Sequence, residues 1–292
     1  MSTAHLASLP SLPPFGAAML LRALLKQPAR SSTGQVDATW RLDRIDADHV
    51  RRYQAAFGFR GDAVPLTFLY LLAQRAQLAT MLACPIPFRI PGLIHVENRL
   101  AMHAPVVLDA PLALTTVLQL PPPAPNGALH AVLETHAFDG ERLAFSCDST
   151  YLIRRGDRTG RNAPPPEAPH GEALGGWTVA HEAGRHYAAL SGDWNPIHLW
   201  RWSARLMGMR TPIVHGAHTL AKACSLLQTA CGQEITSVWS RFRQPVPLGS
   251  SVALFQRDTE GRFAAVCDDR IVIEGRYAVP LADRTSPRLQ QS

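Results

Sequence analysis

The chain has 292 residues, of which 46% are hydrophobic and 18% are charged. This composition is typical of a globular protein and excludes wholesale disorder. The formal net charge is +6, but the basic residues form no dense run with interleaved aromatics, so nucleic acid is not an expected partner.

The cysteines predict reduced thiols rather than a disulfide framework or a zinc ribbon. They are odd in number, widely scattered, and contain no CxxC pair. We therefore expect a cytoplasmic protein. The N-terminal apolar patch at residues 15–25 is interrupted by Arg22. It is far from the roughly 18 uninterrupted apolar residues of a spanning helix, so no membrane insertion is expected.

The first half begins with a long apolar stretch, residues 64–82, which predicts a buried helix of about five turns. Four strand-like runs follow at residues 92–100, 106–118, 129–138 and 143–153. Asp139-Gly140 joins the last two and predicts a tight hairpin. The proline cluster at 121–125 predicts a loop.

A linker is predicted at residues 156–175, which are rich in proline, glycine and charge and lack apolar periodicity. This divides the chain into an N-terminal repeat, residues 1–155, and a C-terminal repeat, residues 176–292.

The second half repeats the order of the first. A helix is expected at residues 215–231, followed by strand-like runs at 235–244, 251–256, 263–267 and 271–279. In each half a tyrosine, Tyr53 or Tyr187, precedes the long helix. The sequence therefore predicts an α+β fold in which a central helix followed by an antiparallel meander is made twice.

The chemistry-bearing residues lie between Tyr187 and His198. Gly192 permits a sharp turn after a helical piece, and Asn195-Pro196 favours another tight turn. Together these turns can bring Asp193 and His198 to one pocket, where a carboxylate and an imidazole suit acid–base work on water. The alternative is that Asp193 caps a helix and His198 is a satisfied polar group.

Ser-Gly-Asp-Trp-Asn-Pro-Ile-His at 191–198 resembles the signature of the MaoC-like, (R)-specific enoyl-CoA hydratases. Tyr187, Leu190 and Ala204 also fill positions of that pattern, and residues 212–216 resemble the start of the family's central helix. The resemblance implies a double hotdog, in which each repeat wraps a curved antiparallel sheet around a long helix.

The resemblance also implies a hydro-lyase that reversibly adds water to a trans-2-enoyl thioester and gives the (R)-3-hydroxyacyl product. Asp193 and His198 correspond to its catalytic pair, and Asn195, with Ser191 and Gly192, would support the loop. The backbone N–H of Gly216, at the start of the predicted helix, suits an oxyanion hole.

The substrate would be an acyl-CoA or an acyl carrier protein thioester. Coenzyme A or pantetheine would enter as part of that substrate, and no metal or redox cofactor is required. The sequence leaves open whether two chains form a homodimer.

The first half lacks this signature, because Asp62 is not followed by Asn-Pro-x-His. It resembles the degenerate repeat of two-hotdog members, in which one repeat shapes the acyl tunnel. The apolar helix residues Phe68, Leu69 and Leu72 would line that tunnel or form ordinary core.

Five further residues are candidates for substrate binding: Tyr187, Trp194, His215, Arg241 and Arg243. The two arginines alternate along a strand-like run, which suits either the phosphates of coenzyme A or a solvated strand face. Trp194, with Trp200 and Trp202, would form a wall of the acyl pocket or anchor the loop.

His198, His215 and His218 could in principle hold a metal, but such a site needs further ligands and suitable geometry, and the resemblance leaves none of these histidines free for it, so no metal site is predicted. Two rival functions remain beside the hydratase hypothesis. A hotdog thioesterase would need an acidic residue on the central helix, and residues 215–231 contain none. The other rival is a catalytically silent acyl-thioester-binding protein.

Overall fold

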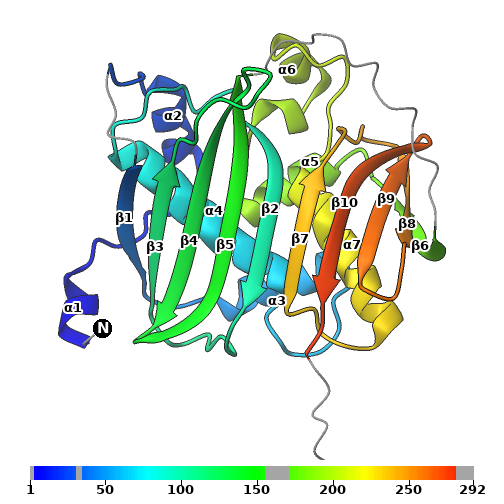
Figure 1. Ribbon diagram of the computed structural model, residues 1–292, viewed down its shortest axis with the longest axis horizontal. Helices are drawn as coiled ribbons and strands as arrows, with labels where there is room; N and C mark the ends of the chain where they lie inside the picture. The colour runs from blue at the N-terminus through cyan, green and yellow to red at the C-terminus, as the bar shows by residue number, and fades with distance from the viewer. Residues whose placement is uncertain (1–2, 31–34, 155–170, 281–292) are drawn as a thin grey trace, which may run out of the picture.

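The computed structural model describes residues 3–30, 35–154 and 171–280, which form one ten-stranded sheet with helices on one face (Figure 1). All pairings between neighbouring strands are antiparallel, in the order β1-β3-β4-β5-β2-β7-β10-β9-β8-β6. The strands are β1 (Gln35–Leu42), β2 (Ile94–Met102), β3 (Leu112–Gln119), β4 (Leu129–Asp139), β5 (Arg142–Arg154), β6 (Glu172–Thr178), β7 (Ser237–Phe242), β8 (Ser251–Gln256), β9 (Arg262–Cys267) and β10 (Arg270–Ala278).

Two long helices, α4 and α7, lie behind the sheet in the view of Figure 1. The helices are α1 (Thr3–Ser8), α2 (Ala17–Leu25), α3 (Ala47–Phe57), α4 (Leu66–Ala83), α5 (Ala183–Ser191), α6 (Arg201–Leu206) and α7 (Gly216–Cys231), with a short 3-10 helix, η1 (Pro196–His198). Because α4 packs against both the sheet and other helices, most of its residues are buried and it is apolar on nearly every side.

The two halves are related by an approximate two-fold arrangement. Read from the centre outward, β2, β5, β4, β3 and β1 match β7, β10, β9, β8 and β6 in order. The halves meet where β2 pairs with β7, and Asn98 there faces Ser240, both fully buried. The structure thus contains the repeated order of one long helix and a meander that the sequence predicts.

The tight hairpin predicted at Asp139-Gly140 is present between β4 and β5, with Gly140 in the left-handed region at φ 61°. Its counterpart between β9 and β10 uses Asp268 and Asp269, at φ 48° and 57°. Aspartate is among the few residues that tolerate this conformation.

The predicted linker is too long at its C-terminal end, because β6 already begins at Glu172; most of the predicted segment lies outside the described residues. The edge strands β1 and β6 were not predicted. In β6, Gly176 lies so close to β8 that a Cβ there would be 2.5 Å from the Val252 carbonyl oxygen. Glycine that signals a linker in the sequence therefore serves close strand pairing here.

All five cysteines are free thiols, as predicted. Among the described helices, none combines the length and the hydropathy needed to cross a lipid bilayer.

Candidate active site

The loop that carries the signature begins where α5 ends. Gly192 terminates the helix in the left-handed conformation, at φ 78°. Asn195 then starts η1, because its side-chain oxygen accepts the Ile197 N–H at 3.3 Å. Ser191 fixes the intervening turn: its Oγ accepts the Asp193 N–H at 3.1 Å and donates to the Tyr187 carbonyl at 2.8 Å.

His198, the last residue of η1, is buried and held in one tautomer. Its Nδ1 lies 2.9 Å from the Ile213 carbonyl oxygen, which can only accept, so Nδ1 carries the proton and Nε2 keeps a free lone pair. Burial lowers the pKa of His198, and the nearby Asp193 carboxylate offsets only part of that shift. The imidazole is therefore neutral at neutral pH and can accept a proton at Nε2.

The Asp193 carboxylate is oriented through both of its oxygens. Oδ1 accepts the Asn195 N–H at 3.2 Å and so closes the turn before η1; the residue that caps η1 is Asn195 and not Asp193. Oδ2 accepts from Nε2 of Gln74 on α4, at 3.1 Å. The N-terminal repeat therefore contacts the acid of the C-terminal repeat directly.

His215 ties the acid and the imidazole together. Its Nε2 donates to the backbone carbonyl of Asp193 at 3.0 Å, and its ring stacks on His198 with 3.6 Å between the centroids. Burial and the neighbouring His198 hold the pKa of His215 well below its usual range. Tyr187 is buried against the His215 ring, at 4.8 Å between centroids. Tyr187 and His215 are predicted to bind substrate; in this structure His215 contacts both Asp193 and His198, and Tyr187 packs against His215.

Gly216 is the first residue of α7, as the sequence predicts. The first N–H groups of a helix have no intrahelical acceptor, and the helix dipole favours negative charge there. The Phe242 ring packs so close to Gly216 that a Cβ would lie 2.7 Å from it. The absence of a side chain at Gly216 therefore allows the Phe242 ring of β7 to pack against the start of α7.

Arg241 and Arg243 are not brought to the pair. Along β7, Trp239 and Arg241 alternate with Val238 and Ser240, which are buried toward the helices. Arg241 forms an ion pair with Glu97 at 3.2 Å, and Arg243 approaches Glu274 at 3.5 Å. Their placement agrees with the solvated-face alternative.

The three tryptophans next to the signature lie at the surface. Trp194 is 38% exposed, Trp200 43% and Trp202 64%, and the last two stack at 6.0 Å between centroids. In this structure Trp200 and Trp202 form an exposed aromatic pair at the start of α6, Trp194 is exposed before η1, and the three do not form an enclosed wall.

The sequence reasoning missed Gln74. It singled out Phe68, Leu69 and Leu72 of the same helix, which are buried in the hydrophobic core. The signal available was a polar residue inside a strongly apolar stretch, four positions after Tyr70 and therefore on the same helix face.

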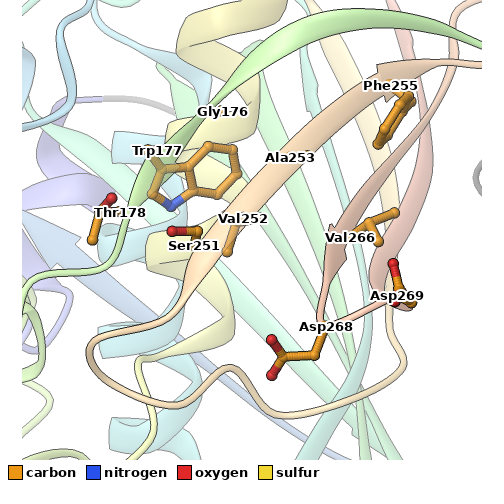
Figure 2. A pocket seen from close by; sticks show the side chains of 10 residues that line it. All are labelled: Gly176, Trp177, Thr178, Ser251, Val252, Ala253, Phe255, Val266, Asp268 and Asp269. Carbon is orange, nitrogen blue, oxygen red and sulfur yellow. The ribbon is translucent and has the colours of Figure 1, made fainter.

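A hollow of about 680 Å³ lies elsewhere, on strands β6, β8 and β9 (Figure 2). Its lining includes Trp177, Phe255 and the hairpin residues Asp268 and Asp269, and neither Asp193 nor His198. In the part of the chain that the structure describes, no group of three or more His, Cys, Asp or Glu residues could hold a metal ion.

The sequence was compared with protein families and with known proteins, and the C-terminal half matches a family model. The family model of the MaoC-like domain matches residues 167–264. A 3-hydroxyacyl-thioester dehydratase X from Mycobacterium tuberculosis is 28% identical over 256 residues, which cover 81% of this chain and 90% of that protein.

Solved structures match the whole fold. The crystal structure of HtdX from M. tuberculosis has a TM-score of 0.67 at 25% identity, covering 85% of this chain and all of that chain. Another M. tuberculosis protein, described as having a double hotdog fold, has a TM-score of 0.54 at 18% identity, covering 84% of this chain and 96% of that chain. These matches confirm the predicted double hotdog.

Proposed function

We propose that this chain, whose residues 167–264 match the family model of the MaoC-like domain, is a hydro-lyase for the hydration and dehydration of an acyl thioester. The finer assignment is reversible conversion of a trans-2-enoyl thioester to the (R)-3-hydroxyacyl thioester. The observation that carries the proposal is a buried His198 whose Nδ1 is held by the Ile213 carbonyl, near an Asp193 carboxylate whose two oxygens are held by Asn195 and Gln74.

In the hydration direction, His198 Nε2 takes a proton from water while the water oxygen bonds to C3 of the enoyl group. Asp193 accepts the second O–H of that water and thereby orients it. The C2–C3 π electrons move toward the thioester carbonyl, and the proton held by His198 then passes to C2. One water is consumed, and addition and protonation occur from the same face, as syn addition requires.

Negative charge develops on the thioester oxygen as the enolate forms. The Gly216 N–H is the proposed donor, because a helix N-terminus offers an unpaired amide and a favourable dipole. The overall reaction changes no net oxidation state, so it needs no redox partner. Coenzyme A and acyl carrier protein present the same pantetheine thioester, and both are proposed carriers.

The test follows the enoyl-thioester absorbance with crotonyl-CoA and a medium-chain trans-2-enoyl-CoA, and with the matching acyl carrier protein thioesters. Wild type should consume the enoyl band, and Asp193→Asn and His198→Gln should each reduce the rate by at least about a hundredfold. His103→Gln, an exposed histidine bonded to Ser146, is the matched control and should retain the rate.

Two results would contradict the proposal. Release of free thiol without loss of the double bond to water would indicate a thioesterase. Binding of the thioesters without turnover would indicate a silent binding protein.

A further inference from the structure

Gln74 of α4 joins the two repeats at the carboxylate of Asp193. Its Nε2 is 3.1 Å from Asp193 Oδ2, across 119 positions of sequence. A carboxylate oxygen only accepts, so the amide must present its nitrogen to Asp193. The orientation of the Gln74 side chain is therefore fixed by chemistry.

The other end of the same amide is unusual. Gln74 Oε1 is buried, and it has no hydrogen-bond partner among the residues that the structure describes. A buried amide oxygen without a partner destabilises the folded protein, so a partner for it is expected in the working protein. Oε1 shares the planar amide group with Nε2 and thus lies beside the Asp193 carboxylate.

The surroundings of this carboxylate are polar on the side of the N-terminal repeat. The charge of Asp193 affects the pKa values of Tyr70 and Tyr151 in the N-terminal repeat, and of Tyr187 and His198 in its own repeat. Tyr70 precedes Gln74 by four residues on α4, and its hydroxyl lies 3.3 Å from His95 Nδ1 on β2. The N-terminal repeat therefore places hydrogen-bonding side chains, and not only apolar ones, near the Asp193 carboxylate.

We propose that Gln74 is a positioning residue for the reaction: its Nε2 holds Asp193 Oδ2 in place, and its Oε1 accepts a hydrogen bond from a second water, beside the one whose two hydrogens point to His198 and Asp193. This inference rests on the proposed hydration reaction. It makes the active site a joint product of the two repeats, since the catalytic pair comes from one and part of its hydrogen-bonding frame from the other.

Gln74→Leu is the first variant, because leucine has a similar volume and neither donates nor accepts. We expect kcat to fall roughly 10- to 100-fold with little change in KM, since misplacement of the acid affects the transition state more than ground-state binding. In an Asp193→Asn background the same substitution should cost much less, because the two changes remove one shared interaction.

Gln74→Glu separates positioning from a merely structural role. When protonated, the glutamate has one O–H that can donate to Asp193 and a carbonyl oxygen that can accept, in place of the NH2 group and carbonyl of the amide; when ionised, it repels the Asp193 carboxylate. The ratio of variant to wild-type kcat should therefore be highest at low pH and fall as pH rises. A structural effect alone would leave that ratio independent of pH.

Gln77→Leu is the matched control. Gln77 is a buried glutamine on the same helix, and among the described residues its amide nitrogen bonds groups of the N-terminal repeat alone, such as Ser149 Oγ at 3.1 Å. It should lower thermal stability at least as much as Gln74→Leu without changing the pH dependence of kcat.

The outcomes separate this inference from the function on which it rests. Wild type that fails to hydrate any of the thioesters contradicts the proposed function. An active wild type whose Gln74→Leu and Gln74→Glu variants keep wild-type rates at every pH overturns the role of Gln74 alone.

Discussion

Gly184 lies so close to the backbone of His198 that it leaves no room for a side chain. It lies at the start of α5, and a Cβ there would be 1.9 Å from the backbone oxygen of His198. Nothing larger than hydrogen fits, so α5 and η1 pack backbone to backbone at this point.

Gly184→Ala should therefore displace η1 and with it the His198 ring. We expect kcat/KM for enoyl-thioester hydration to fall by about a hundredfold, the effect of a displacement on the order of 1 Å in a reacting group. The control is Gly16→Ala, because Gly16 is extended at φ 176° and a Cβ there meets nothing within 4 Å. Equal losses in the two variants would contradict this account.

At the level of elements, two helices begin with the same kind of side-chain cap, but only one of them carries a proposed catalytic residue. Asn195 caps η1 through the Ile197 N–H, and Asp46 caps α3 through the Asp48 N–H at 2.9 Å. Each satisfies one of the N–H groups that a helix start leaves without a partner.

Replacing either cap by alanine should lower the free energy of unfolding by about 0.5–2 kcal/mol, measured by urea denaturation. Only Asn195→Ala should also slow hydration, because η1 ends at His198 whereas α3 carries none of the proposed catalytic groups. A comparable loss of activity in Asp46→Ala would show that stability alone limits the rate.

The two long helices could be predicted because each is a strong apolar run with a clear end, such as Gly232 after α7, which is in the left-handed region. The edge strands β1 and β6 could not, since an edge strand is half exposed and β6 contains the glycines that also signal a linker. Their positions follow from pairing with β3 and β8, which no local pattern encodes.

The residues of the candidate site likewise include some that the sequence predicts and some that it does not. Ser191, Asp193 and His198 lie close together in sequence, so the signature predicts that they belong together. Gln74 reaches Asp193 only through the packing of the two repeats, and a glutamine in an apolar helix can equally bond to strands of its own repeat. The direction of Arg241 stayed open at the level of sequence, because strand alternation does not reveal which face of the sheet the helices cover.

At the scale of the whole molecule, buried histidines set how stability depends on pH. Burial lowers the pKa of His95 and of His218 to about 3, and it also lowers those of His198 and His215. Below about pH 6.5 the unfolded chain binds protons at these positions, whereas the folded chain does not until the pH approaches the lowered values.

The free energy of unfolding should therefore fall as pH drops from 6.5 toward 3, by roughly 1.4 kcal/mol per pH unit for each of His95 and His218. Urea denaturation at pH 7.5 and 5.5 measures this loss. His95→Gln should show a shallower decline than wild type over the same interval. Stability that stays constant or rises on acidification would contradict the burial of neutral imidazoles.

Because β2 and β7 join two halves of one chain, the residues of this site can evolve differently in each half. Two identical subunits meeting at a symmetric seam must carry every residue twice, so a helper glutamine and the acid it supports would have to coexist in each copy. In this chain the halves are separate stretches of one gene, and a substitution in α4 leaves α7 untouched. Gln74 and Asp193 can therefore be selected together, because neither residue has to be repeated at the equivalent position of the other half.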